Sequence, residues 1–236
     1  MDNNASLNEF ARQYYGLLGG SVYKDPVEIS KDNTALVIID AQYCITKDYY
    51  LKSFAAMGFD ATPFLAALDQ LETNTNQTLG NIEKILNKCR EKGILPIHIN
   101  IESYLQDGRD VGRLHKSAGL VYVPNSEPAS FIGQAMPADD EIVLKKTCSS
   151  IHVGTPIDRV LRNMNIKKVI VAGFYTDQCV STSVRDLSDL GYEVVIIEDA
   201  INAMSQERHE NALQSIKKIY ANSEKTDELL ARLDLL

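Results

Sequence analysis

"KKVIVAGFYTDQCVSTSVRDLSDLGYEVVIIEDAI" (residues 167–201) is the stretch that decides the fold of this chain. It begins with an apolar run rich in branched residues, 167–174, which is typical of a strand buried on both faces. An amphipathic segment follows and stops at Gly191, as a helix would. A second branched run occupies 193–201. A strand, a helix and a further strand in this order form a right-handed βαβ unit, which predicts a parallel sheet.

The same alternation continues along the rest of the chain. Helical periodicity is clearest at 74–91, whereas residues 44–71 and 104–140 follow no regular period and are expected to be irregular. We therefore expect residues 1–236 to form one three-layer, Rossmann-like α/β domain with a six-stranded, mostly parallel sheet and an N-terminal arm over about residues 1–30. The other predicted strands are 34–40, 94–102, 141–146 and a short one near 219–221.

Composition and charge argue against several classes of protein. Of 236 residues, 44% are hydrophobic and 24% are charged, as in an ordinary globular domain. The net charge of −8 argues against nucleic-acid and anionic-membrane partners, and no apolar run reaches the roughly 18 residues of a membrane span. The N-terminus has no basic start followed by an apolar stretch, so no signal peptide is expected. Scattered cysteines without a C-x-x-C pair indicate reduced thiols and a cytoplasmic location.

Three chemically useful residues lie at the ends of predicted strands. Asp40 ends the first strand, Lys146 ends the third, and Cys179 comes just after the fourth. In an open parallel sheet the active site lies beyond the carboxyl ends of the strands, so we expect these side chains to converge. A free thiol has a pKa of roughly 8.5, which the first turn of a helix and a nearby lysine should lower. Together the three residues would supply a thiolate nucleophile, a base and a cation.

Each of these residues also has an ordinary structural interpretation. A lone cysteine is most often a small buried hydrophobe. Asp40 could cap a helix, and Lys146 could be a solvated strand end. The observation that favours a site is that all three fall at the matching ends of separate strands, although they are far apart in the sequence.

Four segments carry a likeness to a known family: "ALVIIDAQ", "EIVLKKTCSS…GTPIDRVLRNMNI", "VIVAGFYTDQCVSTSVRDLSDLGYEVVIIEDAI" and "HENAL…TDELLARL". With "DGRDVGRL" they span most of residues 34–235. In these segments the chain resembles the isochorismatase-like cysteine hydrolases, a superfamily that includes nicotinamidase, N-carbamoylsarcosine amidase, ureidoacrylate and biuret hydrolases, and isochorismatase itself. The resemblance implies that Asp40, Lys146 and Cys179 are a catalytic triad.

The resemblance also implies how such a site would work. The family's cis peptide corresponds to the pair Tyr175–Thr176, and the backbone N–H groups of Tyr175, Thr176 and Cys179 would form the oxyanion hole. The reaction would hydrolyse a C–N bond of a small amide, ureide or carbamoyl compound through an acyl-thioester. No cofactor is implied, and members of the family usually form homo-oligomers.

One departure from the family concerns metal binding. Nicotinamidases carry an Asp-x-His and further metal ligands after the second strand. The corresponding segment here, "HINIESYLQDGRD", has a single histidine, His98, and lacks that spacing. We therefore expect no metal and interpret His98 as a core or pocket-wall residue. The pocket walls are expected to come from residues 44–60 and 104–135.

The candidate substrate-binding residues are Gln42, Tyr43, His152 and Arg113. His152 stands where the family commonly has an aromatic residue. Arg109 and Arg113 could bind a substrate carboxylate, or they could form ion pairs with Asp107 or Asp110, which is the interpretation we favour.

Two other functions remain open at this stage. An isochorismatase-type enzyme cleaves a vinyl ether and needs no thiol, so the presence of Cys179 argues against it. A non-catalytic α/β module that binds a partner protein would have no need for three matching strand-end residues. A phosphatase of the haloacid-dehalogenase type is excluded because "IIDAQ" lacks the second aspartate.

Overall fold

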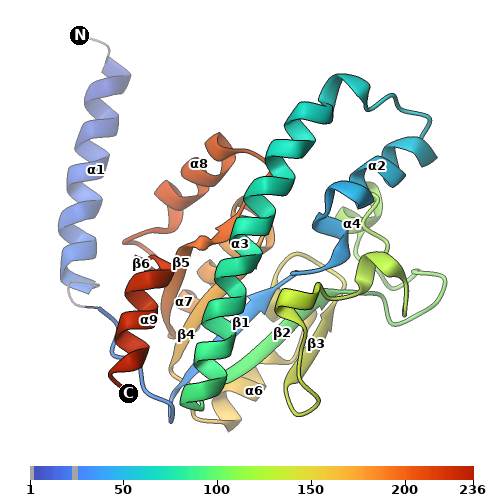
Figure 1. Cartoon of the computed structure of the whole chain (residues 1–236). Helices are drawn as coiled ribbons and strands as arrows, with labels where there is room; N and C mark the ends of the chain where they lie inside the picture. Colours follow the sequence, from blue (N-terminus) through green and yellow to red (C-terminus); the bar gives the residue numbers. More distant parts are fainter. Residues whose placement is uncertain (1–2, 23–25) are drawn as a thin grey trace.

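The computed structural model describes residues 3–22 and 26–236 of the chain (Figure 1). Within these residues, six strands form one sheet in the order β3-β2-β1-β4-β5-β6, and every neighbouring pair is parallel. The predicted six-stranded α/β sheet is therefore confirmed, with all of its pairs parallel. The strands are β1 (Thr34–Ile39), β2 (Leu95–Ile101), β3 (Ile142–Lys146), β4 (Lys168–Phe174), β5 (Glu193–Asn202) and β6 (Asn222–Glu224).

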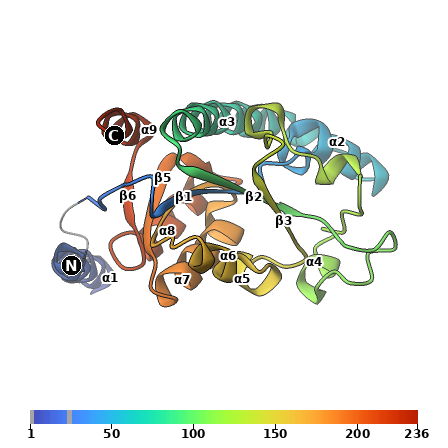
Figure 2. The ribbon, with the colours of Figure 1, turned by 90° about the horizontal axis from the view of Figure 1, so that it is seen from below.

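Helices cover both faces of the sheet and give the molecule three layers (Figure 2). Helices α3 and α9 lie over one face, and α5, α6, α7 and α8 lie over the other. The helices are α1 (Asn3–Val22), α2 (Lys47–Ala56), α3 (Leu65–Lys92), α4 (Arg113–Ser117), α5 (Ile151–Gly154), α6 (Ile157–Asn163), α7 (Ser181–Asp189), α8 (Gln206–Ile216) and α9 (Thr226–Asp234). Short 3-10 helices cover Tyr43–Ile45, Thr62–Phe64, Glu127–Ala129 and Gly133–Ala135, and a π-helix covers Thr176–Val180.

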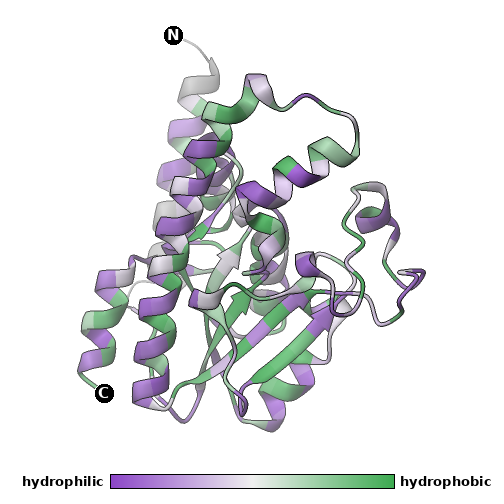
Figure 3. Cartoon of the chain, turned by 45° about the vertical axis from the view of Figure 1, so that its right-hand side comes forward, coloured by the Kyte–Doolittle hydropathy of each residue, from purple (hydrophilic) through white to green (hydrophobic). Residues whose placement is uncertain are grey.

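The central strands form the hydrophobic core. Strand β1 lies between β2 and β4, and its five apolar residues, 35–39, are fully buried. The hydrophobic strands run through the interior, whereas the polar positions of the helices face outward (Figure 3). A continuous run of apolar residues therefore forms a strand that is buried on both of its faces, as the sequence predicts. The short strand β6 begins three residues later than the predicted 219–221 segment.

Two helices differ from the sequence-based expectation. Helix α3 begins at Leu65, well before residue 74, and its buried face includes Thr75 and Thr78. These threonines separate the buried Leu68 and Leu71 from the apolar positions that begin at Leu79. The apolar periodicity therefore does not extend to the first part of the helix, which the sequence did not predict. Helix α2 lies in a region expected to be irregular, and the Thr46 side chain caps it by accepting a hydrogen bond from the Tyr49 N–H.

Helix α1 accounts for most of the expected N-terminal arm. It stands apart from the sheet on the β6 side (Figures 1 and 2), and Leu7, Phe10 and Tyr14 are exposed on it. Residues 1–2 and 23–25 of the expected arm lie outside the described part of the chain. None of the helices in the described ranges is both long enough and apolar enough to cross a membrane.

Candidate active site

The structure brings the three strand-end residues together. Asp40 directly follows β1, Lys146 is the last residue of β3, and Cys179 lies in the π-helix that follows β4. The Nζ atom of Lys146 donates hydrogen bonds to Oδ2 of Asp40 at 2.8 Å and to Sγ of Cys179 at 3.3 Å. Lys146 is fully buried, and Asp40 and Cys179 are only 3% and 6% exposed. The expected convergence at the carboxyl end of the sheet is therefore present.

The backbone aims Asp40 away from the strand. Asp40 has a positive φ of 53°, a left-handed conformation that Asp tolerates better than most residues. Its N–H donates to the carbonyl of Ile99 at 2.9 Å, and its own carbonyl accepts from the Gln42 N–H at 2.9 Å. These bonds hold the turn between β1 and the next segment. The chain therefore bends at the residue whose carboxylate faces Lys146.

Two glycines make room for this arrangement. At Gly173, whose φ is 123°, an added Cβ would lie 2.0 Å from the carbonyl oxygen of Ile39. Only glycine therefore lets the end of β4 approach the end of β1 this closely. At Gly154 an added Cβ would lie 2.8 Å from Cβ of Lys146. Close packing from α5 thus holds the lysine against its two partners.

The protonation state of the site follows from burial and charge. Burial alone would lower the pKa of Lys146, but the negative charge of Asp40 and the proximity of Cys179 raise it, so the lysine is a stable cation. Burial raises the pKa of Asp40 against the opposing effect of Lys146. Burial, and then the charge of Asp40, raise the pKa of Cys179 to about 12. The lowered thiol pKa expected from the sequence is therefore wrong for the resting site, because burial and Asp40 outweigh Lys146.

A cavity of about 240 Å³ opens onto Asp40 and Cys179. This volume lies below the roughly 300–1,000 Å³ of typical ligand pockets, which suits a small molecule. We call this cavity the aromatic pocket because five of its residues are Tyr or Phe. It is lined by Asp40, Cys44, Ile45, Tyr49, Tyr50, Ile101, Ala118, Leu120, Tyr122, Phe174, Tyr175, Gln178, Cys179 and Met204.

Two of the predicted substrate-binding residues, Gln42 and Tyr43, do not line the aromatic pocket. Gln42 is fully buried, and its side-chain amide donates to the carbonyls of Ile101 and Ala129 at 3.0 and 2.9 Å while accepting from the Ile101 N–H at 2.8 Å. Its hydrogen-bonding groups are thus used to hold neighbouring backbone. The Tyr43 hydroxyl instead accepts a hydrogen bond from Lys52 at 2.7 Å. Neither residue therefore lies where it would bind a substrate in this pocket.

The other predicted contacts are also away from the aromatic pocket. His152 on α5 is outside its lining, and neither ring nitrogen has a hydrogen-bond partner among the described residues. Arg113 is exposed on α4, so its predicted contact with substrate is not supported by its position. Arg109 forms the expected ion pair with Asp107 at 3.1 Å.

His98 is a core residue and not a pocket-wall residue. It is fully buried, and its Nε2 donates a hydrogen bond to Oε2 of Glu141 at 2.8 Å. Because an ionised carboxylate can only accept, this nitrogen carries the proton. In the described ranges, no group of three or more His, Cys, Asp and Glu side chains is arranged to hold a metal ion.

The segment between β4 and α7 differs from the prediction in one detail. The cis peptide bond joins Phe174 and Tyr175, one residue earlier than the predicted Tyr175–Thr176 pair, since β4 ends at Phe174 and the turn starts there. The Tyr175 carbonyl accepts from the N–H groups of Gln178 and Val180 at 3.0 and 3.2 Å. Tyr175 and Cys179 line the aromatic pocket, so this segment forms part of its wall.

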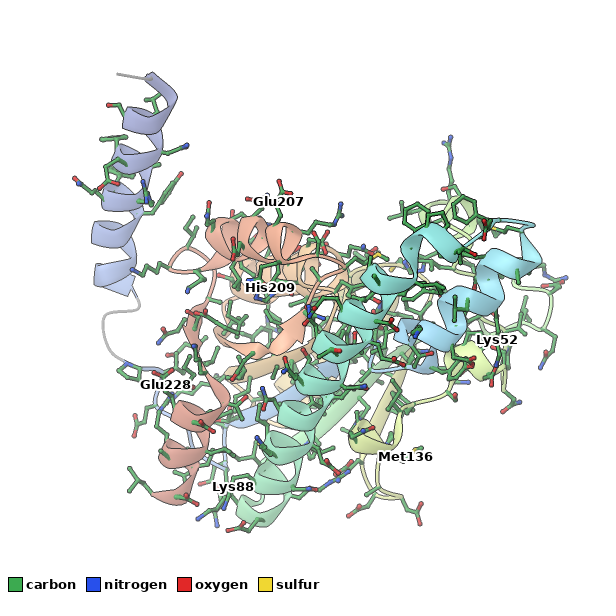
Figure 4. All side chains as sticks on the ribbon, turned by 45° about the horizontal axis from the view of Figure 1, so that its top comes forward. Lys52, Lys88, Met136, Glu207, His209 and Glu228 are labelled. Carbon is green, nitrogen blue, oxygen red and sulfur yellow. The ribbon has the colours of Figure 1, made fainter. Side chains whose placement is uncertain are left out.

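Two side chains of helix α8 contact this segment. His209, which lies on the underside of α8 in Figure 4, has its Nδ1 atom 2.9 Å from Oγ1 of Thr176. Arg208 forms an ion pair with Asp177. Thr176 itself is fully buried. Contacts from α8 to the side chains of Thr176 and Asp177 therefore hold the backbone that precedes Cys179.

The pocket wall includes residues from both segments expected to form it, 44–60 and 104–135, but the sequence did not indicate which of their residues line it. Tyr49 and Tyr50 come from α2, and Tyr122 comes from the long segment between β2 and β3. The one available signal was the Thr cap before "KDYYLKSF", which marks a helix start and would have placed both tyrosines on one helix. The position of Tyr122 carries no such signal.

The chain is similar in sequence to several known proteins. The isochorismatase domain family model matches residues 34–228. An uncharacterized isochorismatase family protein, YrdC of Bacillus subtilis, is 33% identical over 132 residues, which is 56% of this chain and 64% of the length of that protein. The ureidoacrylate amidohydrolase RutB of Agrobacterium fabrum is 25% identical over 198 residues, covering 75% of this chain and 78% of RutB.

Solved structures show the same fold. A cysteine hydrolase from Pseudomonas syringae pv. phaseolicola superposes with a TM-score of 0.73 at 22% identity, covering 88% of this chain and 95% of that chain. N-carbamoylsarcosine amidase from Thermoplasma acidophilum superposes with a TM-score of 0.61 at 22% identity, covering 83% and 97%. Since the family model covers most of the chain, this protein belongs to the isochorismatase family of hydrolases.

Proposed function

We propose that this hydrolase cleaves a C–N bond of a small amide, ureide or carbamoyl compound, with Cys179 as the nucleophile. The observation that carries the proposal is the position of Lys146, whose Nζ bridges Oδ2 of Asp40 and Sγ of Cys179 next to the aromatic pocket. A cation between a carboxylate and a thiol can stabilise negative charge on either one. The names of RutB and of N-carbamoylsarcosine amidase, which denote hydrolases of C–N bonds, support this class of reaction.

The reaction would begin with transfer of the thiol proton to Asp40 as Sγ of Cys179 attacks the substrate carbonyl carbon. A thiol with a pKa of about 12 is protonated at rest, and a carboxylate with a raised pKa is a better acceptor for its proton. Attack forms a C–S bond and places negative charge on the carbonyl oxygen. The backbone N–H groups of Tyr175, Thr176 and Cys179 are the proposed donors to that oxygen.

The tetrahedral intermediate would then collapse. Asp40 gives its proton to the leaving nitrogen, the C–N bond breaks, and ammonia or an amine departs to leave an acyl-thioester. Asp40 next accepts a proton from a water molecule that attacks the thioester carbonyl. Breaking the C–S bond returns the proton from Asp40 to the thiol and releases the acid.

The test is substitution of Cys179. A screen of small amides, ureides and carbamoyl compounds for ammonia release identifies a substrate, on which Cys179→Ala should lose at least about 10⁴-fold in kcat. Cys148→Ala is the matched control, because Cys148 is a half-buried thiol outside the aromatic pocket. Amide hydrolysis that survives in Cys179→Ala would disprove the thioester route. A vinyl-ether substrate still cleaved by that variant would establish the isochorismatase-type alternative.

A homo-oligomer formed through α1 is also part of the proposal. Its exposed Leu7, Phe10 and Tyr14 offer an apolar surface that a second copy could cover. Sedimentation at micromolar concentration should show a species larger than the monomer, and deletion of residues 1–25 should reduce its mass. A monomer in both samples would reject the proposed homo-oligomer. A reduced Cys179 also fits the cytoplasmic location expected from the sequence.

A further inference from the structure

The aromatic pocket contains almost no charge. Asp40 is the one ionisable acid or base among its lining residues apart from thiols and phenols, and the described lining includes no Lys, Arg or His. The nearest cation, Lys146, is fully buried and already donates to Asp40 and Cys179. A substrate carboxylate in this cavity would therefore have no cationic partner from the residues that line it.

Two other cations of this region, Lys52 and Arg113, do not line the cavity either. Lys52 of α2 forms ion pairs with Asp48 at 2.9 Å and Glu127 at 3.1 Å. Figure 4 shows Lys52 at the outer end of the molecule beside the segment that carries Glu127. Arg113 is exposed and does not line the cavity. Binding of an acid through Lys52 would require breaking its ion pairs with Asp48 and Glu127.

The polar groups of the wall are largely paired with one another. The Tyr122 hydroxyl donates to the Tyr49 hydroxyl at 3.1 Å, and the Tyr50 and Tyr175 hydroxyls are hydrogen-bonded to each other. Tyr49 packs edge to face against Tyr122, and Phe174 packs in the same way against Tyr175. In both pairs the ring centroids are 5.9 Å apart. Aromatic rings and aliphatic side chains therefore form most of the surface that a substrate would meet.

Electrostatics then select against charged substrates of either sign. An anion would leave water for an apolar cavity without a counter-ion and would face Asp40, which is unfavourable. A cation would gain little from Asp40, because Lys146 at 2.8 Å already neutralises that carboxylate. An uncharged aromatic or branched aliphatic group loses nothing on transfer and gains from burial.

We propose, building on the function proposed above, that the substrate is an amide or carbamoyl compound whose non-reacting part is uncharged and apolar. The cavity volume of about 240 Å³ restricts that part to a single small ring or a short branched chain. The reacting carbonyl lies against Cys179, and the apolar group lies against the tyrosines. This inference concerns the substrate's charge and shape, and not the bond that is cleaved.

The test compares matched amides on the full chain. Benzamide and 3-carbamoylbenzoate form one pair, and isovaleramide and succinamate form another. The uncharged member of each pair should have a kcat/KM about 100-fold or more above that of the acid. A carboxylate amide, or an amide with a quaternary ammonium group, that is turned over as well as the neutral one overturns the proposal.

Binding separates this inference from the proposed function. Calorimetry or ligand-observed NMR on Cys179→Ala measures affinity for the same pairs without turnover. Tighter binding of the neutral members supports the inference even if no amide is hydrolysed, in which case only the proposed reaction fails. Equal or tighter binding of the acids contradicts the inference even if amide hydrolysis is found.

A substitution in the wall provides the reciprocal test. Ala118 lines the cavity from an exposed position at the end of α4, so a longer side chain can be accommodated there. Ala118→Arg should raise the ratio of kcat/KM for the acid to that for the neutral amide by about tenfold, and the gain should fall with salt. Ala118→Gln adds length without charge and should leave this ratio low. An unchanged ratio in Ala118→Arg would show that the missing cation does not set the selectivity.

Discussion

Strand β3 has a buried carboxylate paired with a cation at each end, and the two pairs behave in opposite ways. At the start of the strand, Glu141 accepts two hydrogen bonds from Arg90 at 2.7 and 2.8 Å, one from His98 at 2.8 Å and one from the Ala138 N–H at 3.0 Å. At the other end, the strand's last residue, Lys146, is the cation of Asp40. Oδ1 of Asp40 has no hydrogen-bond partner among the described residues.

The difference in partners sets the two pKa values apart. The hydrogen bonds from Arg90, against the opposing effect of burial, lower the pKa of Glu141 to about 2. Burial raises the pKa of Asp40, because its single cation does not fully replace the lost water. A carboxylate whose two oxygens both accept hydrogen bonds, as those of Glu141 do, stays ionised and supports the fold. A carboxylate with one oxygen left unsatisfied can accept a proton, which is what a general base requires.

Among the changes that test this comparison of the two carboxylates, neutralising Asp40 should have the largest effect. Asp40→Asn keeps the shape of the side chain but cannot accept the Cys179 proton, so kcat should fall by about 10²–10⁴-fold. The variant also leaves Lys146 buried beside an uncharged group, so a loss of stability is expected as well. Steady-state ammonia release, together with circular dichroism to confirm folding, measures both. Turnover within a few-fold of the parent protein would remove Asp40 from the mechanism.

The same change at the other end of the strand should affect stability alone. Glu141→Gln removes the charge that pairs with Arg90 and should lower the free energy of unfolding by about 1–3 kcal/mol, with kcat preserved. Urea denaturation measures this loss. Glu91→Gln is the control, because the Glu91 ion pair with Lys88 is at the surface, where such pairs contribute about 0–1 kcal/mol. A drop in kcat for Glu141→Gln would mean that the two ends of β3 are coupled.

The pH dependence of stability should also distinguish Glu141. Its pKa is about 2 in the folded chain against an ordinary value of 4.5. A depressed folded-state pKa contributes stability above the unfolded-state pKa, and this contribution is lost as the pH falls from about 4.5 to about 2. Urea midpoints measured across this range should fall less steeply in Glu141→Gln than in the parent chain. Identical slopes would show that other carboxylates dominate the acid transition.

The sequence predicted the cluster of side chains at the carboxyl end of β3, but not the cluster at its start. Asp40, Lys146 and Cys179 were found because each follows or ends a continuous apolar run, and the geometry of a parallel sheet brings such positions together. Glu141 and the fully buried His98 form a second cluster. No rule links a residue before one strand to the interior of its neighbour. The pairing depends on the register between β2 and β3, which the structure alone supplies.

The sequence indicated the two segments, 44–60 and 104–135, that form much of the aromatic pocket, but not which of their side chains meet there. Tyr49 and Tyr122 meet edge to face although they come from a short helix and from a long irregular segment. Their meeting depends on how those segments fold over the strand ends, and neither segment has a period from which this could be derived. Gln42 and Tyr43 follow Asp40 closely in the chain, but neither side chain lines the aromatic pocket.

The smallest effect, and the most informative about Asp40, concerns alkylation of Cys179 by iodoacetamide in the resting protein. The charge of Asp40 is the second cause, after burial, of the raised Cys179 pKa. In Asp40→Asn that charge is gone, and a Cys179 thiolate can take its place as the counter-ion of Lys146. The pKa of Cys179 should therefore fall.

Each unit by which the pKa of Cys179 falls increases its thiolate fraction about tenfold at neutral pH. A thiolate of lower pKa is also a weaker nucleophile, so the alkylation rate rises only about threefold per unit. Brief labelling and peptide mapping should thus show faster alkylation of Cys179 in a variant that has lost turnover, with Cys148 as the internal reference. Adding Lys146→Met to Asp40→Asn should reverse the gain, because the counter-ion is then absent. Slower alkylation in Asp40→Asn would instead mean that Asp40 already holds the thiol proton in the resting protein. Asp40 would then have to be treated as the acid of a preformed ion pair between the Cys179 thiolate and Lys146.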